Sequence, residues 1–290
     1  MEKRLKEILT VLFLLLIIAL ALFAIVYINE YKKIDELKVV FFDVGQGDSI
    51  YIETPGGSDI LIDGGPDNKI LDKLGREMPF WDRSLDLVIL THPHADHVNG
   101  LVEVLTRYKV EEILYTGVNY NNQAYYELKE IIQEKNIKVT FAIAGQDYEF
   151  DNNIKLEILY PFKSLQDVEV KEVNNSSIVT LLDYNETEFL LTGDLEKEGE
   201  LELIKKYQDL STEVLKAGHH GSKSSSSLEL LRAVSPEYVV IQSGKDNSFN
   251  HPHEITLNRL QNLEIDVLRN DSLGNIEFTT NGEAFKYMVK

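Results

Sequence analysis

The histidines of this 290-residue chain are confined to three short segments. The seven of them are His92, His94 and His97, then His219 and His220, then His251 and His253. Random scatter along the chain would rarely leave every other region without a histidine. Imidazole and carboxylate groups are ligands that zinc, manganese and iron commonly take in proteins. The clustering therefore predicts a metal centre that is assembled from these segments.

The first segment, Thr91–His97, contains four candidate ligands directly after an apolar stretch that is predicted to be a strand. One residue separates His92 from His94, so an extended backbone points both side chains the same way. Asp96 and His97 follow the turn and can face a second ion. The spacing thus favours two adjacent metal ions over a polar loop with incidental histidines.

The arrangement His-x-His-x-Asp-His is similar to the metal-binding motif of the metallo-β-lactamase superfamily. Other segments resemble further motifs in the same order, and they are Phe42–Ser49, Leu61–Gly65, Leu191–Asp194, Ala217–Ser222 and His251–His253. The first and the last two are similar to the ComEC-type branch, the hydrolase domain of DNA-uptake proteins. The resemblance extends from Lys38 to Lys290 and implies a two-metal hydrolase. The multi-span channel of ComEC proteins has no counterpart here, so we do not expect a competence role.

The resemblance implies that the first histidine pair holds one ion, that the Asp-His pair after it holds the other, and that a later aspartate bridges both. The implied ligands are therefore His92, His94, Asp96, His97, Asp194 and His219. Spacing does not distinguish His219 from His220, and we expect His219 to bind metal while His220 lies near the substrate. The expected catalytic groups are His220 together with Asp96 and Asp194, either of which can orient the attacking hydroxide.

Asp63 is not expected to bind metal. In the superfamily such an aspartate accepts a hydrogen bond from a ligand imidazole and sets its tautomer. A simple turn before Gly64-Gly65 is the alternative explanation. Gln46 and Asp48, in the first motif, either shape the site or only form a turn.

One departure from the superfamily pattern concerns the first metal ion, which often receives a third histidine. No histidine lies between His97 and His219, and Val173–Ser177 occupies the corresponding place, as asparagine does in the ComEC-type branch. An amide oxygen is a hard, weak ligand, so the first site is expected to be weaker or better suited to manganese than to zinc. Asn175 is our candidate for substrate binding here, and a plain turn is the alternative.

The serine-rich run that begins at Ser222 lies between a predicted strand and a predicted helix. Its hydroxyl groups, Lys223 and the free amides of a helix start favour a phosphate-binding loop over a flexible linker. His251 and His253 are expected to donate a proton or to contact phosphate, unless they only cap the next helix. These four residues complete the predicted substrate site.

The strands that must carry these residues come in two groups, one beginning at Val39 and one at Ile154. Each group is followed by alternating helices and strands, and Asn281-Gly282 predicts a closing hairpin. Two sheets packed face to face with helices outside would bury such strands on both faces. The expected fold is therefore an α/β protein of the αββα sandwich type, with the site where strand ends of both halves meet.

An uncharged segment precedes this domain and is predicted to span a membrane. Residues 8–28 form a helix of roughly 30 Å, enough to cross a bilayer core. The apolar run is longer than a signal-peptide core and ends without a small-x-small site, which favours an uncleaved anchor over a cleaved signal. The predicted division is an anchor at 1–29, a tether at 30–37 and a hydrolase domain at 38–290.

Basic residues near the chain start set the expected orientation. Lys3, Arg4 and Lys6 favour a cytoplasmic N-terminus, although Lys32 and Lys33 on the other flank argue against it. We expect a single-pass protein of the cell membrane with its catalytic domain outside the cytoplasm.

Composition limits the partners. The net charge is −19, so the surface offers no sequence-independent grip on nucleic acid, and no stable coating of DNA is expected. The chain contains no cysteine, which excludes disulfides and thiolate metal sites. Protein partners are not indicated by any pattern.

The predicted reaction is hydrolysis of a phosphodiester by a metal-bound hydroxide, with two zinc or manganese ions as cofactors. The candidate substrates are a nucleic acid, a nucleotide or a cell-wall phosphodiester. The alternatives are a β-lactam, amide or lactone hydrolase of the same fold, and a non-catalytic metal-binding protein.

Overall fold

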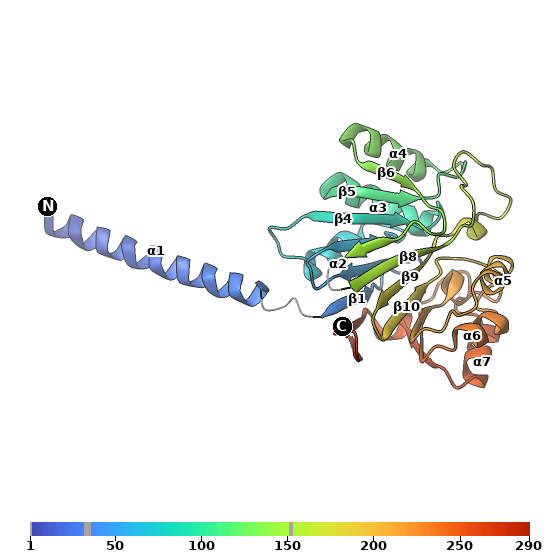
Figure 1. Cartoon of the computed structure of the whole chain (residues 1–290). Coiled ribbons are helices and arrows are strands. Elements are labelled where there is room, and N and C mark those ends of the chain that lie inside the picture. The colour runs from blue at the N-terminus through green and yellow to red at the C-terminus, as the bar shows by residue number, and fades with distance from the viewer. Residues whose placement is uncertain (1, 32–35, 151–152) are drawn as a thin grey trace.

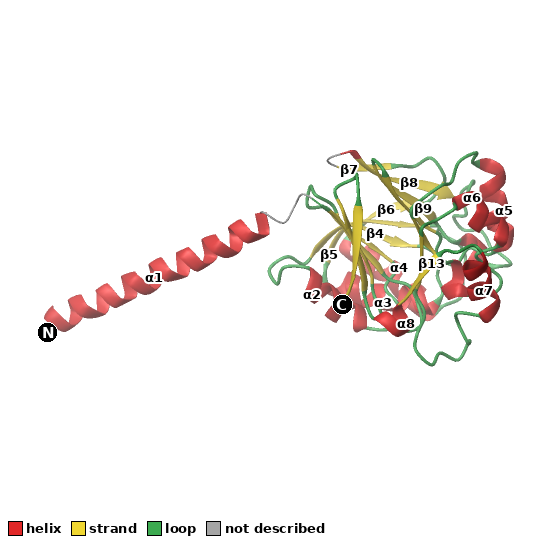
Figure 2. Cartoon of the chain, turned by 90° about the horizontal axis from the view of Figure 1, so that it is seen from below, coloured by secondary structure: helices red, strands yellow, loops and turns green. Residues whose placement is uncertain are grey.

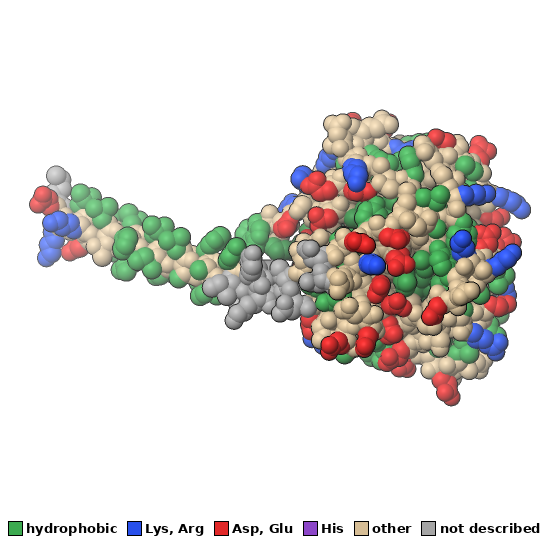
Figure 3. Space-filling model, viewed as in Figure 1, with side chains coloured by type: hydrophobic (Ala, Val, Ile, Leu, Met, Phe, Trp, Pro, Cys, Tyr) green, Lys and Arg blue, Asp and Glu red, His purple; other side chains and the backbone are tan. Residues whose placement is uncertain are grey.

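The computed structural model describes residues 2–31, 36–150 and 153–290. Helix α1 (Glu2–Tyr31) precedes the domain, and none of its residues up to Tyr27 is buried. On the face that Figure 3 shows, hydrophobic side chains cover helix α1, and its charged side chains lie near its N-terminus. The helix is long and apolar enough to cross a membrane. Half of the predicted tether, residues 32–35, lies outside the described residues.

Two mixed sheets form the centre of the domain (Figure 1). The first has the order β15-β14-β1-β2-β3-β4-β5-β6. Its strands are β1 (Leu37–Phe41), β2 (Ile50–Glu53), β3 (Asp59–Ile62), β4 (Ser84–Leu90), β5 (Lys109–Tyr115), β6 (Lys138–Phe141), β14 (Ile276–Thr280) and β15 (Phe285–Val289). Strands β3 to β6 run parallel, so their carboxyl ends lie at the same end of the sheet.

The second sheet has the order β13-β12-β11-β10-β9-β8-β7. Its strands are β7 (Tyr148–Phe150), β8 (Ile154–Tyr160), β9 (Val179–Tyr184), β10 (Thr187–Leu191), β11 (Val214–Lys216), β12 (Tyr238–Ile241) and β13 (Asp266–Arg269). Strands β10 to β13 are parallel, so this sheet also collects carboxyl strand ends at one end.

Helices cover the outer face of each sheet (Figure 2). Against the first sheet lie α2 (Lys69–Glu77), α3 (Ala95–Arg107) and α4 (Gln123–Lys135). Against the second lie α5 (Lys197–Lys206), α6 (Leu228–Val234) and α7 (Glu254–Asn262). The short helix α8 (Asn270–Leu273) leads from the second sheet back to β14. The predicted αββα sandwich is therefore confirmed.

Apolar residues of both sheets meet in a central core. Phe41 of the first sheet and Phe189 of the second both contact Phe278, with edge-to-face ring distances of 6.0 and 5.6 Å. All three side chains are fully buried. Such aromatic contacts stabilise a core beyond the area that they bury, so the two sheets form one unit around the site.

The hairpin predicted around Asn281-Gly282 is present, and it joins the first sheet beside β1 although it follows the second half of the chain. Helix α2 and strand β7 were not predicted. Helix α2 is nine residues long and buries only Ile70 and Leu74, which leaves too short an apolar stripe for a periodicity argument.

Candidate metal centre

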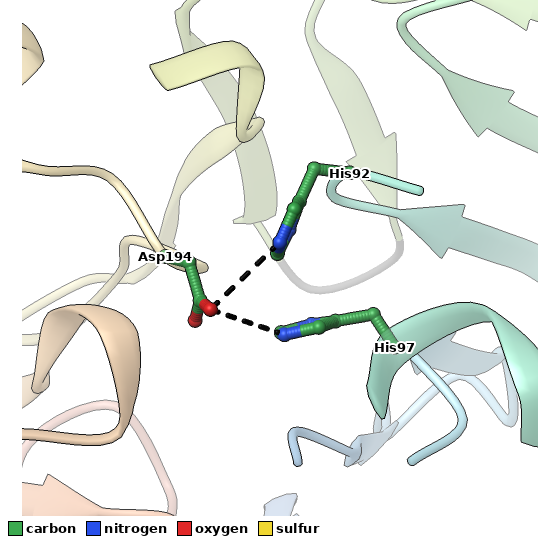
Figure 4. Close-up of side chains that lie close together, drawn as sticks. All are labelled: His92, His97 and Asp194. Atoms are coloured by element: carbon green, nitrogen blue, oxygen red, sulfur yellow. Dashed lines mark ion pairs between the residues drawn. The ribbon is translucent and has the colours of Figure 1, made fainter. Parts of the chain in front are cut away.

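Parallel strand ends of both sheets meet at the site. Thr91-His92 follows β4, Asp194 follows β10, and His220 follows β11. The backbone amide of Ile178 donates to the carbonyl of Thr91 at 3.1 Å, which joins the two halves directly. Figure 4 shows His92, His97 and Asp194 pointing toward one another from these different elements.

Asp194 lies at the centre of the cluster. Its Oδ2 atom is 3.3 Å from Nε2 of His97, 3.4 Å from Nε2 of His220 and 3.7 Å from Nε2 of His92. The corresponding distance to Nε2 of His219 is 4.0 Å. One carboxylate oxygen thus faces four imidazole nitrogens, the placement that a bridging carboxylate needs.

Helix α3 carries the second half of the first motif. It begins at Ala95, so Asp96 and His97 lie in its first turn, and an acidic residue there is favoured by the helix dipole. A Cβ atom on Gly100 would lie 1.9 Å from the carbonyl oxygen of Gly64, so only glycine allows the helix to lie this close to the loop after β3. This close approach brings His97 beside Asp63.

Asp63 makes the contact to an imidazole that was expected for it. Its Oδ2 accepts a hydrogen bond from Nδ1 of His97 at 2.8 Å. The amide and hydroxyl of Thr91 donate to the same carboxylate at 2.8 and 2.7 Å. With Nδ1 engaged, Nε2 of His97 is left facing the cluster.

The Thr91 hydroxyl also lies 3.1 Å from Nδ1 of His92, and the Ser177 hydroxyl lies 3.4 Å from that atom. Nε2 of His92 is therefore free to face the cluster, where it lies 3.0 Å from Nδ1 of His94. Thr91 and Ser177 were not predicted as site residues. The only signal for them was a polar residue at the end of an apolar strand or beside the asparagine pair.

His220, rather than His219, occupies the buried position of the second histidine motif. Its Nε2 is 3.1 Å from Oδ2 of Asp96, and its side chain is 1% exposed. The His219 side chain is 25% exposed, and its Nδ1 lies 3.2 Å from Glu196. Both residues have positive φ angles, 48° and 55°. This paired left-handed conformation costs of order 1–3 kcal/mol per residue and directs consecutive side chains into different surroundings, which spacing alone did not reveal.

A buried ion pair lies behind His220. The Lys216 ammonium is 2.5 Å from Oδ2 of Asp48, and both side chains are at most 2% exposed. Oδ1 of Asp48 is 3.1 Å from Nδ1 of His220, and Lys216 also donates to the carbonyls of Gly193 and Ala217. Asp48 therefore does more than form a turn. Lys216 was missed, although a lysine within an apolar strand of three residues is itself a signal.

The electrostatics of the cluster are those of a site built for cations. Burial by itself lowers the pKa of His220, but Asp194 and Asp48 outweigh it and raise that pKa to about 10. Burial also opposes protonation of His97, yet Asp194 and Asp63 raise its pKa well above the ordinary value. In His92, burial and the neighbouring His97 lower the pKa well below its usual range.

The residues present fit a metal centre. Nε2 of His97 and Oδ1 of Asp194 are buried without a hydrogen-bond partner among the described residues. Buried polar atoms of this kind are rare unless a ligand takes them. Two groups of three residues bring their donor atoms close enough to share one ion. One group is His92, His97 and Asp194, and the other is Asp96, His97 and His220. Imidazole and carboxylate donors suit zinc and manganese.

Asn174 and Asn175 are adjacent in sequence but make different contacts. Oδ1 of Asn175 accepts the Glu196 amide at 3.0 Å, so it holds the loop after Asp194. Oδ1 of Asn174 is buried without a partner among the described residues, while its amide nitrogen lies 3.3 Å from Nδ1 of His219. Asn174, rather than the predicted Asn175, therefore presents a free oxygen near the site.

The predicted phosphate-binding loop is wrong in its central feature. The amides of Ser226 and Ser227 donate to Glu200 at 2.5 and 2.9 Å, and the Ser227 hydroxyl caps α6. The helix start is therefore occupied by a buried carboxylate of the chain itself. Lys223 is exposed, and Ser222 is buried with its hydroxyl 3.0 Å from that of Ser224.

The third histidine segment lies beside the cluster. The rings of His251 and His219 are 5.4 Å apart, and Nδ1 of His251 is 3.4 Å from the Gln46 amide. Burial, followed by the neighbouring His220 and His219, lowers the pKa of His251 to about 4. Nδ1 of His253 accepts the Lys223 amide at 3.1 Å, so this ring supports the loop.

The sandwich and the histidine–aspartate cluster define a class that comparison with known proteins also supports. Residues 42–245 match the metallo-β-lactamase superfamily, and the chain belongs to it. Its hydrolase fold carries the residues described above.

Among curated relatives, the chain is 30% identical over 260 residues to ComE operon protein 3 of Bacillus subtilis. It is 32% identical over 259 residues to competence protein ComA of Neisseria gonorrhoeae. These matches cover 84% and 87% of this chain but only 33% of each relative, so the chain spans about a third of their length. The predicted similarity to the ComEC-type branch is thereby confirmed.

Two solved structures share the fold. The metallo-β-lactamase fold protein YhfI from Bacillus subtilis aligns with a TM-score of 0.57 at 12% identity, over 85% of this chain and 100% of that one. Igni18, a metallo hydrolase from Ignicoccus hospitalis, aligns with a TM-score of 0.52 at 18% identity, over 84% and 98%.

Proposed function

We propose that this protein is a membrane-anchored phosphodiesterase with two divalent metal ions. The observation that carries the proposal is the position of Oδ2 of Asp194 within 4.0 Å of four histidine Nε2 atoms. The similarity to ComEC-type relatives supports a phosphodiester as the substrate class, such as a nucleic acid, a nucleotide or a cell-wall polymer.

Each metal ion would be held by residues from both halves of the domain. His92 and His94 would hold one ion, and Asp96, His97 and His220 would hold the other, with Asp194 between them. His220 replaces His219 in this set because it lies against Asp96 and is buried. When bound, two such ions supply Lewis acidity and lower the pKa of a water molecule that attacks the substrate.

The surrounding residues of the chain would then position the reacting groups. Asp63 and Thr91 hold the tautomers of His97 and His92. The backbone carbonyl of Gln242 accepts from Nδ1 of His220 at 2.9 Å, beside the Asp48–Lys216 pair. His219, partly exposed and 3.2 Å from Glu196, would give a proton to a leaving oxygen. In this proposal His219 and His220 would exchange the roles that the sequence suggested for them.

A cavity of about 810 Å³ adjoins the cluster, where it is lined by Asn175, Glu196 and Ser224. Lys163, Lys171 and Lys197 also line it, together with several glutamates. This space exceeds what a single phosphate group needs and offers room for the flanking part of a polymeric substrate. Its mixed charge agrees with local recognition rather than sequence-independent coating of a polyanion.

The experiment that tests this proposal is hydrolysis of bis(p-nitrophenyl) phosphate by the full chain in detergent, stripped of metal and reloaded with manganese or zinc. We expect turnover that requires metal and that is lost in the double variant Asp96→Ala His97→Ala. The matched control is Asp72→Asn, since Asp72 pairs with Arg76 on the exposed face of α2. Stoichiometric metal binding without turnover would refute the phosphodiesterase and favour acyl or lactone hydrolysis or a non-catalytic role.

We also propose that α1 remains attached and that the domain lies outside the cytoplasm. The helix is long and apolar enough to cross a bilayer, and Lys3, Arg4 and Lys6 at its start favour a cytoplasmic N-terminus. Protease added to intact cells would digest the domain in this orientation and spare it in the opposite one.

A further inference from the structure

The connection between α2 and β4 carries two large side chains that the domain does not cover. Phe80 is 84% exposed and Trp81 is 55% exposed. Their rings contact each other edge to face at 4.7 Å. An adjacent Phe–Trp pair at the tip of a connection leaves apolar area in water that burial elsewhere would remove.

This connection lies at the end of the domain where the chain arrives from α1. Strand β1 is antiparallel to β2, β2 is antiparallel to β3, and β3 is parallel to β4, so β1 and β4 begin at the same end of the sheet. Figure 1 shows the connection projecting from that end. Three strand spacings separate β1 from β4, a distance of about 14 Å.

The chain length between α1 and β1 limits how far this end can lie from the anchor. Helix α1 ends at Tyr31 and β1 begins at Leu37. Six residues span at most about 21 Å even when fully extended. If α1 crosses the bilayer, its end lies at the membrane surface, and the Phe80–Trp81 edge lies within reach of the lipid headgroups.

Another part of this end is a hollow between the second sheet and the β14–β15 hairpin. It is lined by Glu186, Glu213, Glu237 and Glu283 together with Lys286. The Thr187 hydroxyl lies 3.0 Å from that of Thr280, which places the start of β10 beside the first sheet at the same end. Carboxylates are repelled by anionic lipid, whereas tryptophan prefers the membrane–water interface. The exposed Phe80–Trp81 pair, rather than this hollow, is therefore the part of this end that suits the membrane–water interface.

The metal centre lies at the opposite end of the strands. Strand β4 contains seven residues from Ser84 to Leu90 and then delivers His92. At about 3.3 Å per residue, this strand separates the aromatic edge from the site by about 23 Å.

We propose that Phe80 and Trp81 insert into the headgroup region of the bilayer that α1 spans. They hold the domain with its metal centre facing away from the membrane, toward substrates in the surrounding water rather than the lipids of the same bilayer. This inference rests on α1 as the anchor and not on the phosphodiesterase reaction.

Trp81 is the only tryptophan of the chain, so all tryptophan fluorescence of the protein comes from this position. The test is tryptophan fluorescence of the full chain in phosphatidylcholine vesicles that contain lipids brominated near the headgroup. We expect bromolipid to quench the emission and iodide in the water to have little effect. Mass spectrometry of the vesicle-bound chain confirms that α1 is retained, and a cleaved chain released from the vesicles would overturn the inference.

The matched control moves the tryptophan to the site end of the molecule. In the variant Trp81→Phe Phe249→Trp, the reporter replaces a side chain that is 59% exposed and stacks on His251. We expect iodide quenching and no bromolipid quenching there. Equal bromolipid and iodide responses at both positions would refute the insertion. The variant Phe80→Ser keeps Trp81 and should reduce bromolipid quenching at unchanged circular dichroism. Since no substrate is present, failure here is distinct from failure of the phosphodiesterase.

Discussion

Replacement of Lys216 by methionine is the sharpest test of how the site is held together. The Lys216 ammonium and the Asp48 carboxylate are both almost fully buried and lie 2.5 Å apart. Methionine fills a similar volume but removes the ammonium group beside Asp48, so that the His220 imidazole, 3.1 Å away, is the cationic neighbour that remains for this buried carboxylate. Removal of one partner from a buried pair costs about 3–5 kcal/mol of unfolding free energy. The carbonyls of Gly193 and Ala217 also lose a donor, at about 1 kcal/mol each.

For a domain of this size, 1 kcal/mol corresponds to roughly 2–4 °C in Tm. The loss of the pair alone should therefore lower the Tm of Lys216→Met by roughly 6–20 °C. The assay is thermal unfolding of the metal-free full chain, followed by circular dichroism. The control is Lys197→Met, since Lys197 and Glu229 form an exposed pair that contributes about 0–1 kcal/mol.

The double variant Asp48→Asn Lys216→Met separates the ion pair from other effects of the lysine. Because it removes both charges, it should be less destabilised than the sum of the two single variants by at least about 1 kcal/mol. A Lys216→Met chain that is as stable as the Lys197→Met control, or single effects that simply add, would refute the reasoning.

Three further outcomes are expected. Asp63→Asn should weaken manganese or zinc affinity by about 10–100-fold in calorimetric titration, because a neutral amide replaces the carboxylate that accepts from Nδ1 of His97; unchanged affinity would contradict that role. The raised pKa of His220, about 10 against about 6.5 in the unfolded chain, stabilises the metal-free fold below about pH 6.5, and this contribution is lost as the pH rises to about 10. The Tm increase caused by metal should therefore grow across that interval, and a pH-independent increase would count against it. Asn122→Ala should cost about 1 kcal/mol in chemical denaturation, because Oδ1 of Asn122 accepts the Tyr125 amide at the start of α4; no change would mean that water replaces this cap.

The type of fold and the first motif were predictable because both depend on local pattern. Alternating strands and helices report the layers, and β8 begins at Ile154, where the second group of strands was expected. His92, His94, Asp96 and His97 lie within six residues. This spacing alone places the first two after a strand and the last two at the start of a helix, independently of the rest of the chain.

Some residues could be recognised as important while their tasks remained open. Asp63 was expected beside an imidazole, and the tertiary structure identified that imidazole as His97. Asn174 and Asn175 are adjacent, yet one holds a backbone amide and the other presents a free oxygen. The difference depends on the short helical turn at Val173–Ser176, which no periodicity signals.

Three decisions belong to the tertiary structure alone, because each depends on residues far apart in sequence. His220 rather than His219 is buried in the cluster because Asp96 and Asp194, which come from other segments of the chain, lie against its imidazole. Glu200 fills the helix start where a phosphate was expected, since α5 packs beside the serine-rich loop. Lys216 is buried because Asp48, distant in the chain, lies opposite it. The sequence by itself determined which side chains are available for metal chemistry, whereas packing of the two sheets determined which of them meet.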